Sequence, residues 1–330
     1  MGKGAYMFRS CRRLFPLLLT LALLTGCGGM KAEEDSGYVD GVELTEVELE
    51  DEAVALAESP AALDSLLQPV ASGTAVRKNS EALIDYSNIT DGYVMVKYTA
   101  SSTKRLKAQV KGPTTTYTYN VTAGKWETFP LSDGNGAYQV TVYKNISGTK
   151  YSTVLSANFK ATLKDEFAPF LRPNQYVDYG CAVNTVAKAQ ELTKDRTKPL
   201  EMVKVVYDYV VTNLTYDRQK AATVQSGYLP VLDTVLAEKK GICFDYASLM
   251  TGMLRSQGVP CKLVVGYAGT AYHAWINVWS EETGWIDGAI YFDGTSWQRM
   301  DPTFASTGKQ SAKIMAYIGD GKNYTVKYIY

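Results

Sequence analysis

Three residue types that can do covalent chemistry lie in order along the second half of the chain. His273 is the only histidine among the 330 residues, thirty positions after Cys243 and twenty-eight before Asp301. A thiol is a poor nucleophile until a base or a positive field makes it a thiolate, and a carboxylate best orients the imidazole that serves as the base. Cys243, His273 and Asp301 therefore make a candidate catalytic triad.

Composition argues against several other kinds of site. Because there is no second histidine, zinc sites built on paired histidines are hard to assemble, and imidazole chemistry must pass through residue 273. Lys plus Arg and Asp plus Glu number 34 each, so the formal charge is zero and no basic face for nucleic acid is evident. No Gly-rich phosphate loop precedes a Lys-Ser or Lys-Thr pair. We therefore expect no nucleic-acid partner, no cofactor and no metal.

The hydrophobic pattern around the candidate triad predicts helices first and strands afterwards. Helical spacing covers residues 181–193 and 200–214, and a third helix with an apolar face begins at Gly241-Ile242-Cys243 and ends before Gly258. Alternation with a period of two then predicts four strands, at 262–267, 273–279, 285–292 and 297–300. Helices followed by an antiparallel sheet indicate an α+β domain, with predicted bounds 164–330.

This order of elements has a chemical consequence for Cys243. At the first turn of a helix, its sulfur would face free backbone N–H groups and the positive end of the helix dipole, which both favour the thiolate. The same N–H groups could receive the oxyanion of a tetrahedral intermediate, with Tyr216 as a further candidate donor. His273 on a neighbouring strand would handle the proton, and Trp275 is a candidate wall of the cleft.

The orienting carboxylate has two competitors in the sequence. Asp301 follows a predicted strand and is stiffened by Pro302, whereas Asp287 and Asp293 lie beside turn glycines that favour solvated loops. Asp301 is therefore the residue that we predict to fix the imidazole tautomer. Taken singly, a cysteine at a helix start could instead be a small buried hydrophobe, and a lone histidine could be structural.

The N-terminal residues predict export and a lipid anchor. Basic residues precede an apolar stretch at 14–24 that is too short for an ordinary transmembrane helix. The run Leu24-Thr25-Gly26-Cys27 resembles the lipobox of bacterial lipoproteins, which implies removal of residues 1–26 and attachment of lipid to the Cys27 thiol. We expect an extracytoplasmic protein held to the bacterial cell membrane by acyl chains. The alternative is an ordinary signal peptide with a chance cysteine.

Two further segments separate this signal from the α+β domain. Residues 33–58 carry acidic side chains and no Lys or Arg, so we predict a solvated, flexible tether over 27–80, with binding to a basic wall component as the alternative. Residues 81–163 are rich in alternating Tyr, Val and Thr, which predicts strands at 93–99, 106–110, 116–121, 126–131, 137–143 and 151–160. Such strands indicate a small all-β sandwich of the immunoglobulin or fibronectin kind, with a spacer or ligand-binding role.

The α+β region resembles the transglutaminase-like superfamily, whose catalytic layout is papain-like. Five segments in the family's order carry this resemblance: Tyr207-Asp208-Tyr209-Val210 with Leu214-Thr215-Tyr216-Asp217, Gly241-Ile242-Cys243-Phe244-Asp245-Tyr246-Ala247, Leu254-Arg255 with Gly258-Val259-Pro260 and Val265-Gly266-Tyr267, His273-Ala274-Trp275, and Asp301-Pro302-Thr303. They span about residues 199–304 and leave out the predicted sandwich. The resemblance implies Cys243 as the nucleophile, His273 as the base and Asp301 as the orienting group.

Two cysteines, Cys181 and Cys261, lie outside the candidate triad in the same region. Cys261 departs from the family pattern, which would have a small or polar residue after Pro260. The two thiols could form a disulfide in an oxidising compartment, but the sequence cannot show that their sulfurs meet. We expect two independent thiols.

Two functions from different classes fit these features. The first is a lipid-anchored cysteine enzyme that attacks an amide or peptide carbonyl, forms a thioester on Cys243 and passes the acyl group to water or to an amine. Its substrate would be a protein or peptide, with cell-wall peptides among the candidates. The second is a non-catalytic surface module that binds wall peptides or a protein partner in the same cleft. The intact Cys, His and Asp favour the enzyme.

Overall fold

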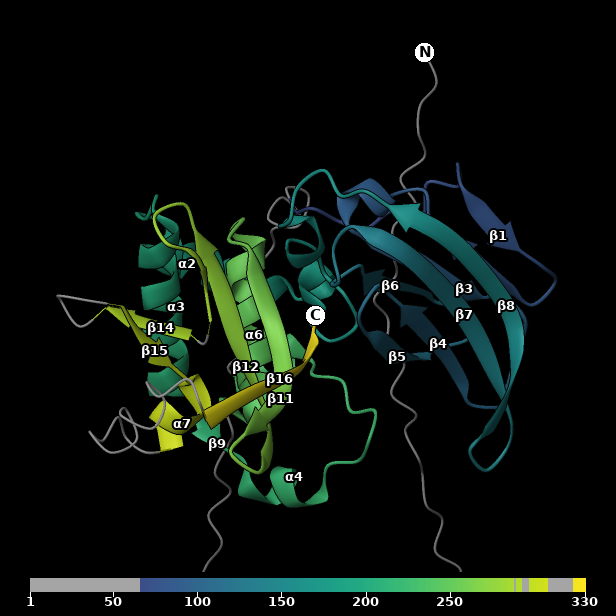
Figure 1. Cartoon of the computed structure of the whole chain (residues 1–330). Coiled ribbons are helices and arrows are strands. Elements are labelled where there is room, and N and C mark those ends of the chain that lie inside the picture. The colour runs from purple at the N-terminus through teal and green to yellow at the C-terminus, as the bar shows by residue number, and fades with distance from the viewer. Residues whose placement is uncertain (1–65, 288, 293–296, 308–322) are drawn as a thin grey trace, which may run out of the picture. The chain divides into compact units, whose positions relative to one another are not determined.

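The computed structural model describes residues 66–330 apart from 288, 293–296 and 308–322 (Figure 1). The predicted signal peptide, Cys27 and most of the predicted tether lie outside these residues. All described residues belong to one compact unit, Ala57–Tyr330. Within the described part of the chain, no helix is both long enough and apolar enough to cross a membrane.

Two antiparallel sheets are built by the first half of the described chain. The first has the strand order β1-β2-β3-β6, with β1 (Val76–Lys78), β2 (Ala82–Asp85), β3 (Tyr93–Tyr98) and β6 (Trp126–Pro130). The second has the order β5-β4-β7-β8, with β4 (Leu106–Lys111), β5 (Thr116–Val121), β7 (Gly136–Ser147) and β8 (Lys150–Ala161). Alternate residues of β4 and β5 are buried, as a sheet with one face on a core requires. Side chains from both sheets belong to the same hydrophobic core.

All six strands predicted between residues 93 and 160 are present, and β7 continues past its predicted end to Ser147. The structure adds β1 and β2, which pair in register with each other, while β2 also pairs with β3. Because β1 lies inside the span that we predicted to be a tether, the sheet begins before residue 81. The likeness of these sheets to an immunoglobulin or fibronectin module stays a prediction.

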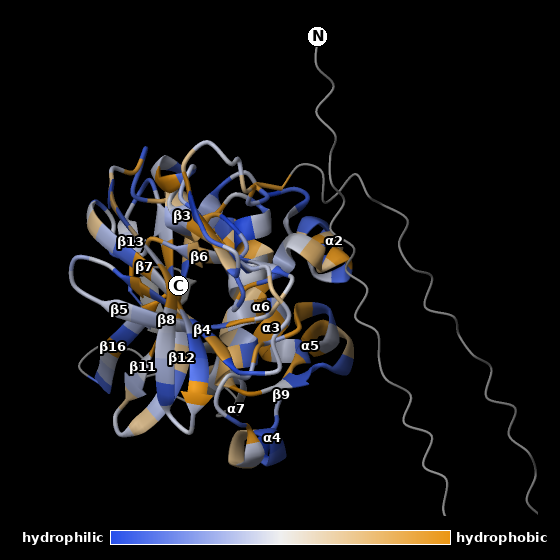
Figure 2. Cartoon of the chain, turned by 90° about the vertical axis from the view of Figure 1, so that its right-hand side faces the viewer, coloured by the Kyte–Doolittle hydropathy of each residue, from blue (hydrophilic) through white to orange (hydrophobic). Residues whose placement is uncertain are grey.

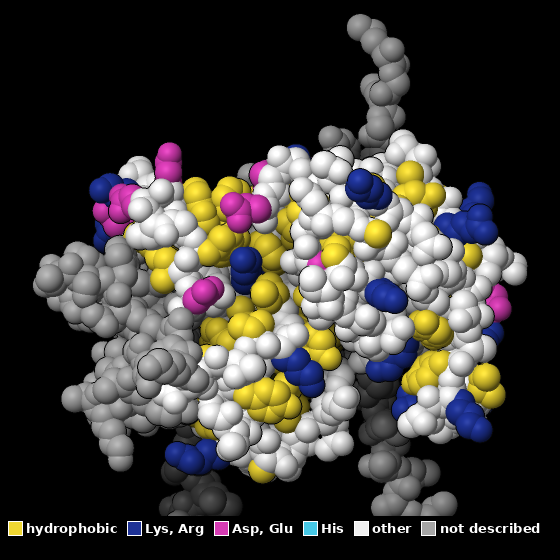
Figure 3. All heavy atoms as spheres, viewed as in Figure 1, with side chains coloured by type: hydrophobic (Ala, Val, Ile, Leu, Met, Phe, Trp, Pro, Cys, Tyr) yellow, Lys and Arg dark blue, Asp and Glu magenta, His cyan; other side chains and the backbone are white. Residues whose placement is uncertain are grey.

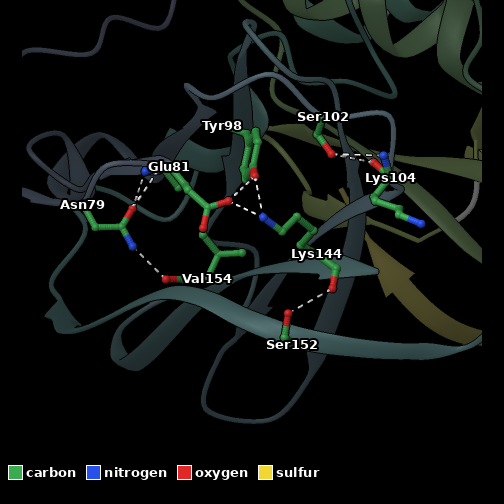
Figure 4. A network of polar contacts seen from close by, with 9 residues as sticks. Asn79, Glu81, Tyr98, Ser102, Lys104, Lys144, Ser152 and Val154 are labelled. Atoms are coloured by element: carbon green, nitrogen blue, oxygen red, sulfur yellow. Dashed lines mark hydrogen bonds and ion pairs between the residues drawn. The ribbon is translucent and has the colours of Figure 1, made fainter. Parts of the chain in front are cut away.

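A polar cluster ties the two sheets together (Figure 4). Glu81 precedes β2 and Tyr98 ends β3 in the first sheet, whereas Lys144 lies on β7 in the second. The Lys144 ammonium donates to the Glu81 carboxylate and, at 3.2 Å, to the Tyr98 hydroxyl, which donates to Glu81 at 2.5 Å. These hydrogen bonds, led by the one from Lys144, lower the pKa of Glu81. Since the side chains of the ion pair are 34% and 37% exposed, water screens it and its contribution to stability is small.

The second half of the described chain packs helices against another antiparallel sheet. Its longer helices are α2 (Val183–Thr193), α3 (Pro199–Asn213) and α6 (Cys243–Ser256). The sheet has the order β13-β12-β11-β16, with β11 (Cys261–Ala268), β12 (Ala271–Ser280), β13 (Gly284–Ile286) and β16 (Tyr324–Ile329). Figure 1 shows α6 beside β11 and β12, and it also contacts α2 and α3. Residues 245–255 of α6 are all buried, so this helix is the centre of the helical layer.

The sequence of α3 explains why it forms a helix and which side it buries. Pro199 stands at the first helical position, where its missing N–H costs nothing. The buried side chains recur three or four positions apart, and they are Leu200, Val203, Val206, Tyr207, Val210 and Val211. Hydrophobic colour is prominent along α3 and α6 in Figure 2. The helices predicted at 181–193 and 200–214 are thus confirmed, with α2 beginning two residues late.

Several short elements do not follow from the hydrophobic pattern, because they are too short for a period to mark them. They are η1 (Ile89–Asp91), η2 (Ala168–Phe170), η3 (Tyr179–Cys181), α4 (Arg218–Thr223), α5 (Leu232–Glu238), α7 (Pro302–Thr307), β9 (Thr215–Tyr216) and β10 (Lys240–Gly241).

The prediction of a single strand over residues 285–292 is wrong. β13 ends at Ile286, and β14 (Ala289–Phe292) pairs with β15 (Trp297–Met300) in a separate sheet. Asp287 follows β13, where an Asp-Gly pair favours a turn over a continuous strand.

Aromatic rings connect β5 to the neighbourhood of Cys243. The Tyr119 ring centroid lies 5.7 Å from that of Tyr176 and 5.9 Å from that of Tyr330. The Tyr176 ring in turn lies 5.6 Å from the ring of Phe244, the residue after Cys243. Packing of this kind buries large apolar area, so the first two sheets support the segment that carries the thiol.

Candidate active site

Cys243 is the first residue of α6, so the helix start predicted there is confirmed. Ile242 before it is extended, with φ −96° and ψ 177°, and its carbonyl accepts the Tyr246 N–H at 3.1 Å. This is the first hydrogen bond of the helix, so the backbone N–H groups before Tyr246 have no helix carbonyl to donate to. They form the positive end of the helix dipole, beside the sulfur. The Cys243 thiol is free and partly exposed.

The chain leading into Cys243 is held from two sides. β10 pairs in parallel with β9, which brings Gly241 level with Tyr216. A Cβ on Gly241 would lie 2.5 Å from the Asp245 Cβ, so only glycine allows this close approach. Burial raises the pKa of the Tyr216 hydroxyl, and the electrostatic interaction with Cys243 adds to the effect. Tyr216 thus lies within electrostatic reach of the thiol, while its role as an oxyanion donor stays a prediction.

His273 lies on β12, opposite Gly266 of β11. A Cβ on Gly266 would lie 2.0 Å from the Thr325 carbonyl oxygen, so glycine lets β16 pack closely on the strand beside His273. The histidine is only 6% exposed, and no histidine side chain is visible on the face drawn in Figure 3. Its imidazole is therefore shielded from bulk water.

Asp301 contacts His273 directly. The Asp301 Oδ2 atom lies 2.5 Å from His273 Nε2 and also accepts the Tyr324 hydroxyl at 3.2 Å. Its Oδ1 atom accepts the Thr303 N–H at 2.9 Å, as a residue before a helix start commonly does. Asp301 is 1% exposed, so these donors replace water around the carboxylate. Because Nε2 faces Asp301, Nδ1 is the ring nitrogen left to exchange a proton with a thiol.

The protonation of His273 reflects opposing effects. Burial lowers its pKa, since the charged imidazolium loses hydration. The Asp301 charge and hydrogen bond, together with the contact to Cys243, act in the opposite direction and prevail, so the pKa of His273 is raised. Imidazolium is therefore favoured at neutral pH, and this is the state that stabilises an adjacent thiolate.

The structure also places the competitors of Asp301. Asp287 is exposed and accepts a hydrogen bond from Asn277 Nδ2 at 2.8 Å. Asp293 lies outside the described residues. Trp275 is only 3% exposed, with its ring 6.3 Å from the His273 ring and edge-on to Tyr324 at 5.2 Å. It packs beside the His273–Asp301 pair, and a role in lining the cleft stays a prediction.

Cys181 and Cys261 do not pair with each other. Cys261 is a free, fully buried thiol whose pKa burial raises to about 11. The expectation of an independent thiol holds for Cys261, whereas it is wrong for Cys181, which is disulfide-bonded. Of the free thiols among the described residues, Cys243 is therefore the one that solvent and a substrate can reach.

Four residues around the site were not selected from the sequence, and they are Lys220, Tyr228, Asp245 and Tyr324. Only Asp245 carried a local signal, because an acidic residue at the third helical position often caps a helix start. The others come from segments far from Cys243 in sequence, and packing alone brings them there. Within the described ranges, no group of three or more His, Cys, Asp and Glu side chains is arranged to hold a metal ion.

Comparison with known proteins identifies the domain that holds this site. Residues 186–302 match the family described as the transglutaminase-like superfamily, and this span contains Cys243, His273 and Asp301. The chain carries a transglutaminase-like domain. The resemblance seen in the five sequence segments is therefore confirmed, and with it a mixed helix and strand fold.

Relatives of the transglutaminase-like domain occur in bacteria. Over 118 residues the chain is 30% identical to the uncharacterized protein YebA of Bacillus subtilis, a match that covers 30% of this chain and 16% of that protein. Over 115 residues it is 28% identical to a protein-glutamine gamma-glutamyltransferase of Pseudomonas aeruginosa, which covers 30% of this chain and 17% of that protein. The chain thus spans less than a fifth of the length of either relative.

A solved structure also aligns with most of the chain. It is the periplasmic domain of TgpA from Pseudomonas aeruginosa bound to ethylmercury, with 19% sequence identity and a TM-score of 0.34. The alignment covers 75% of this chain and 80% of that one.

Proposed function

We propose that this protein is a cysteine-dependent enzyme that attacks an amide or peptide carbonyl through Cys243, with His273 as the base and Asp301 as the orienting group. The 2.5 Å contact between His273 Nε2 and Asp301 Oδ2 carries the proposal, because it leaves Nδ1 for the thiol. Membership of the transglutaminase-like superfamily, which is typically cysteine-dependent, supports it. The accessible thiol at the start of α6 supplies the third group.

The proposed reaction has two halves. With the Cys243 proton already held on His273 Nδ1 as a thiolate–imidazolium pair, the sulfur attacks the carbonyl carbon while the carbonyl electron pair moves to oxygen. Amides of the first turn of α6 receive this oxyanion. When the C–N bond breaks, the amine leaves with the proton from His273 and a thioester remains on Cys243. Water or a second amine then gives its proton to His273 and attacks the thioester. The C–S bond breaks, which releases the acyl group as an acid or a new amide and restores the Cys243 thiolate beside the imidazolium.

Hydrolysis and acyl transfer share this machinery up to the thioester. The acceptor decides between a peptidase or amidase and a protein-glutamine acyltransferase, so both remain within the proposal. The test incubates the protein with casein and a dansylated primary amine. Incorporation of the amine reports acyl transfer, and release of new amino termini, or of ammonia without amine incorporation, reports hydrolysis. A non-catalytic module that binds wall peptides would give none of these products.

The first test of the proposal is the reactivity of the thiols themselves. Iodoacetamide at pH 6, followed by peptide mapping, is expected to label Cys243 rapidly and Cys261 slowly, because the first is partly exposed beside an imidazolium and the second is fully buried. Cys243→Ser serves as the control and should remove the rapid label. A Cys243 that reacts no faster in the folded protein than in guanidinium would contradict the enzyme proposal.

We also propose that the enzyme is exported and held to the bacterial cell membrane through lipid on Cys27, with cell-wall or other extracytoplasmic peptides as substrates. The lipobox-like run at 24–27 supports this. The sheets of residues 76–161 would then form the predicted sandwich between anchor and enzyme. Cys27→Ala is expected to release the protein from the membrane fraction or to block processing of its precursor. Unchanged partitioning of the variant into detergent would count against the anchor.

A further inference from the structure

A buried carboxylate lies two residues after Cys243. Asp245 is fully buried, and its Oδ2 atom accepts the Ile242 N–H at 2.8 Å and the Lys220 ammonium at 2.7 Å. Its Oδ1 atom accepts the Tyr228 hydroxyl at 2.5 Å. The carboxylate therefore touches the backbone on the N-terminal side of Cys243, while its own Cα lies on the C-terminal side.

Lys220 is held in place for this contact. Its backbone N–H donates to Asp217 Oδ1 at 2.9 Å, which caps the start of α4, and the Asp217 N–H donates to the Gly241 carbonyl at 2.8 Å. The Lys220 ammonium also lies 2.5 Å from the Tyr228 hydroxyl and 4.3 Å from that ring's centroid. Its side chain is only 28% exposed, so the ion pair with Asp245 is shielded from water.

The two charges have opposite effects on a thiolate. A carboxylate in the first turn stabilises the helix, because it interacts favourably with the positive helix end. The same negative charge next to Cys243 opposes a second negative charge on the sulfur. A cation bound to the carboxylate removes this penalty and leaves the capping bond to Ile242 intact.

We infer that Lys220 is a positioning residue that neutralises Asp245, so that Asp245 can cap α6 without suppressing the Cys243 thiolate. The inference rests on the proposed function, because it concerns the reactivity of the proposed nucleophile. It assigns to α4 and its loop the task of setting the charge around the start of α6.

Other charged or titratable groups also face Cys243. His273 of β12, backed by Asp301, touches the thiol, and the Tyr216 and Tyr272 hydroxyls interact with it electrostatically. Arg218 interacts with Tyr216 in the same way. Substitutions at Lys220 and Asp245 leave all of these groups in place, so a change in thiol reactivity reports on the ion pair.

The test is the pH dependence of Cys243 alkylation in the full chain, measured with iodoacetamide from pH 4 to pH 9. Lys220→Met leaves the buried carboxylate without its cation and is expected to slow alkylation near the wild-type midpoint by about tenfold, moving the midpoint to higher pH. Asp245→Asn keeps Lys220 and removes the negative charge, so the midpoint should move to lower pH. The two substitutions break the same contact, but the expected shifts have opposite signs.

Three further variants separate charge from structure. Lys220→Arg keeps the cation and should return the midpoint close to that of the wild type. The double variant Lys220→Met with Asp245→Asn restores neutrality and should do the same, even where Lys220→Met alone folds poorly. Tyr228→Phe removes a hydrogen bond without changing the charge and should leave the midpoint in place. Thermal melts report any loss of stability separately.

The outcomes distinguish this inference from the proposed function. A wild-type Cys243 that alkylates only at the pH of an ordinary thiol overturns the proposed function. A reactive wild-type Cys243 whose midpoint moves in the same direction in Lys220→Met and Asp245→Asn, or stays fixed in both, overturns the charge role of Lys220 alone. Opposite shifts with recovery in the double variant support it.

Discussion

Replacing His273 with alanine is expected to slow the alkylation of Cys243 at pH 6 by about a hundredfold, because an ordinary cysteine with a pKa of about 8.5 is almost wholly protonated there. In the proposed mechanism, the buried His273 imidazolium next to Cys243 stabilises the thiolate. Alanine leaves only the helix start to do so, and the pH profile should move toward that of a free thiol. Iodoacetamide rates from pH 5 to pH 9 measure this shift.

Tyr272→Phe is the matched control for His273→Ala, because Tyr272 precedes His273 on β12 and also interacts electrostatically with Cys243. Burial raises the pKa of Tyr272, so its hydroxyl is uncharged over the measured range and its removal should leave the profile unchanged. If His273→Ala behaves like this control, the imidazole does not activate Cys243 and the proposed mechanism is wrong.

His273→Ala should also change how the stability of the folded protein depends on pH. The pKa of folded His273 is raised, so protonation of this residue stabilises the folded state. This stabilisation is fully present below the ordinary histidine pKa of about 6.5 and is lost as pH rises through the folded value. The difference in unfolding free energy between the wild type and His273→Ala should therefore be larger at pH 5.5 than at pH 9. Urea unfolding at the two pH values measures it.

Asp301→Asn is expected to lower turnover on the order of 10³-fold or more, while alkylation of Cys243 changes about tenfold or less. The oxygen of the asparagine amide can still accept the Thr303 N–H. Its NH₂ group then faces the His273 N–H that the Asp301 carboxylate accepts, so two hydrogen-bond donors meet. The imidazole then remains present but takes the wrong tautomer for repeated proton transfer. Turnover of casein and iodoacetamide rates, measured on one preparation, separate the two effects.

Asp287→Asn is the matched control for Asp301→Asn. Asp287 was a competing candidate in the sequence, and in the structure it is exposed and bound to Asn277. Its substitution should leave turnover within about twofold of the wild type, as surface changes away from a site usually do. Equal losses at both positions would mean that Asp301 has no special role in orienting His273.

Much of the fold and part of the site could be predicted from local patterns. The apolar period in residues 200–214 predicts α3, and the turn glycines between alternating runs predict β3 to β8. The helix start at Cys243 follows from the apolar face that begins there. These features depend on neighbours within a few positions along the chain, where sequence and structure are linked by backbone periodicity.

Contacts between distant segments could not be predicted in the same way. Local turn chemistry favoured Asp301 over Asp287, but the contact of Asp301 with His273 depends on where the end of β15 lies relative to β12, and no repeat in the sequence encodes that distance. The division of 285–292 between two sheets depends on which strands find partners, and the buried state of Cys261 depends on the packing of α6 over β11.

By itself the sequence determined the transglutaminase-like domain, the position of Cys243 at a helix start and the single histidine that can serve it. Only the tertiary structure decided that Asp301 meets His273, and that Lys220 and Tyr228 surround Asp245. The physical reason is that a helix start or a strand is set by interactions among adjacent residues. A charge pair between remote segments is set by the burial and packing of whole elements.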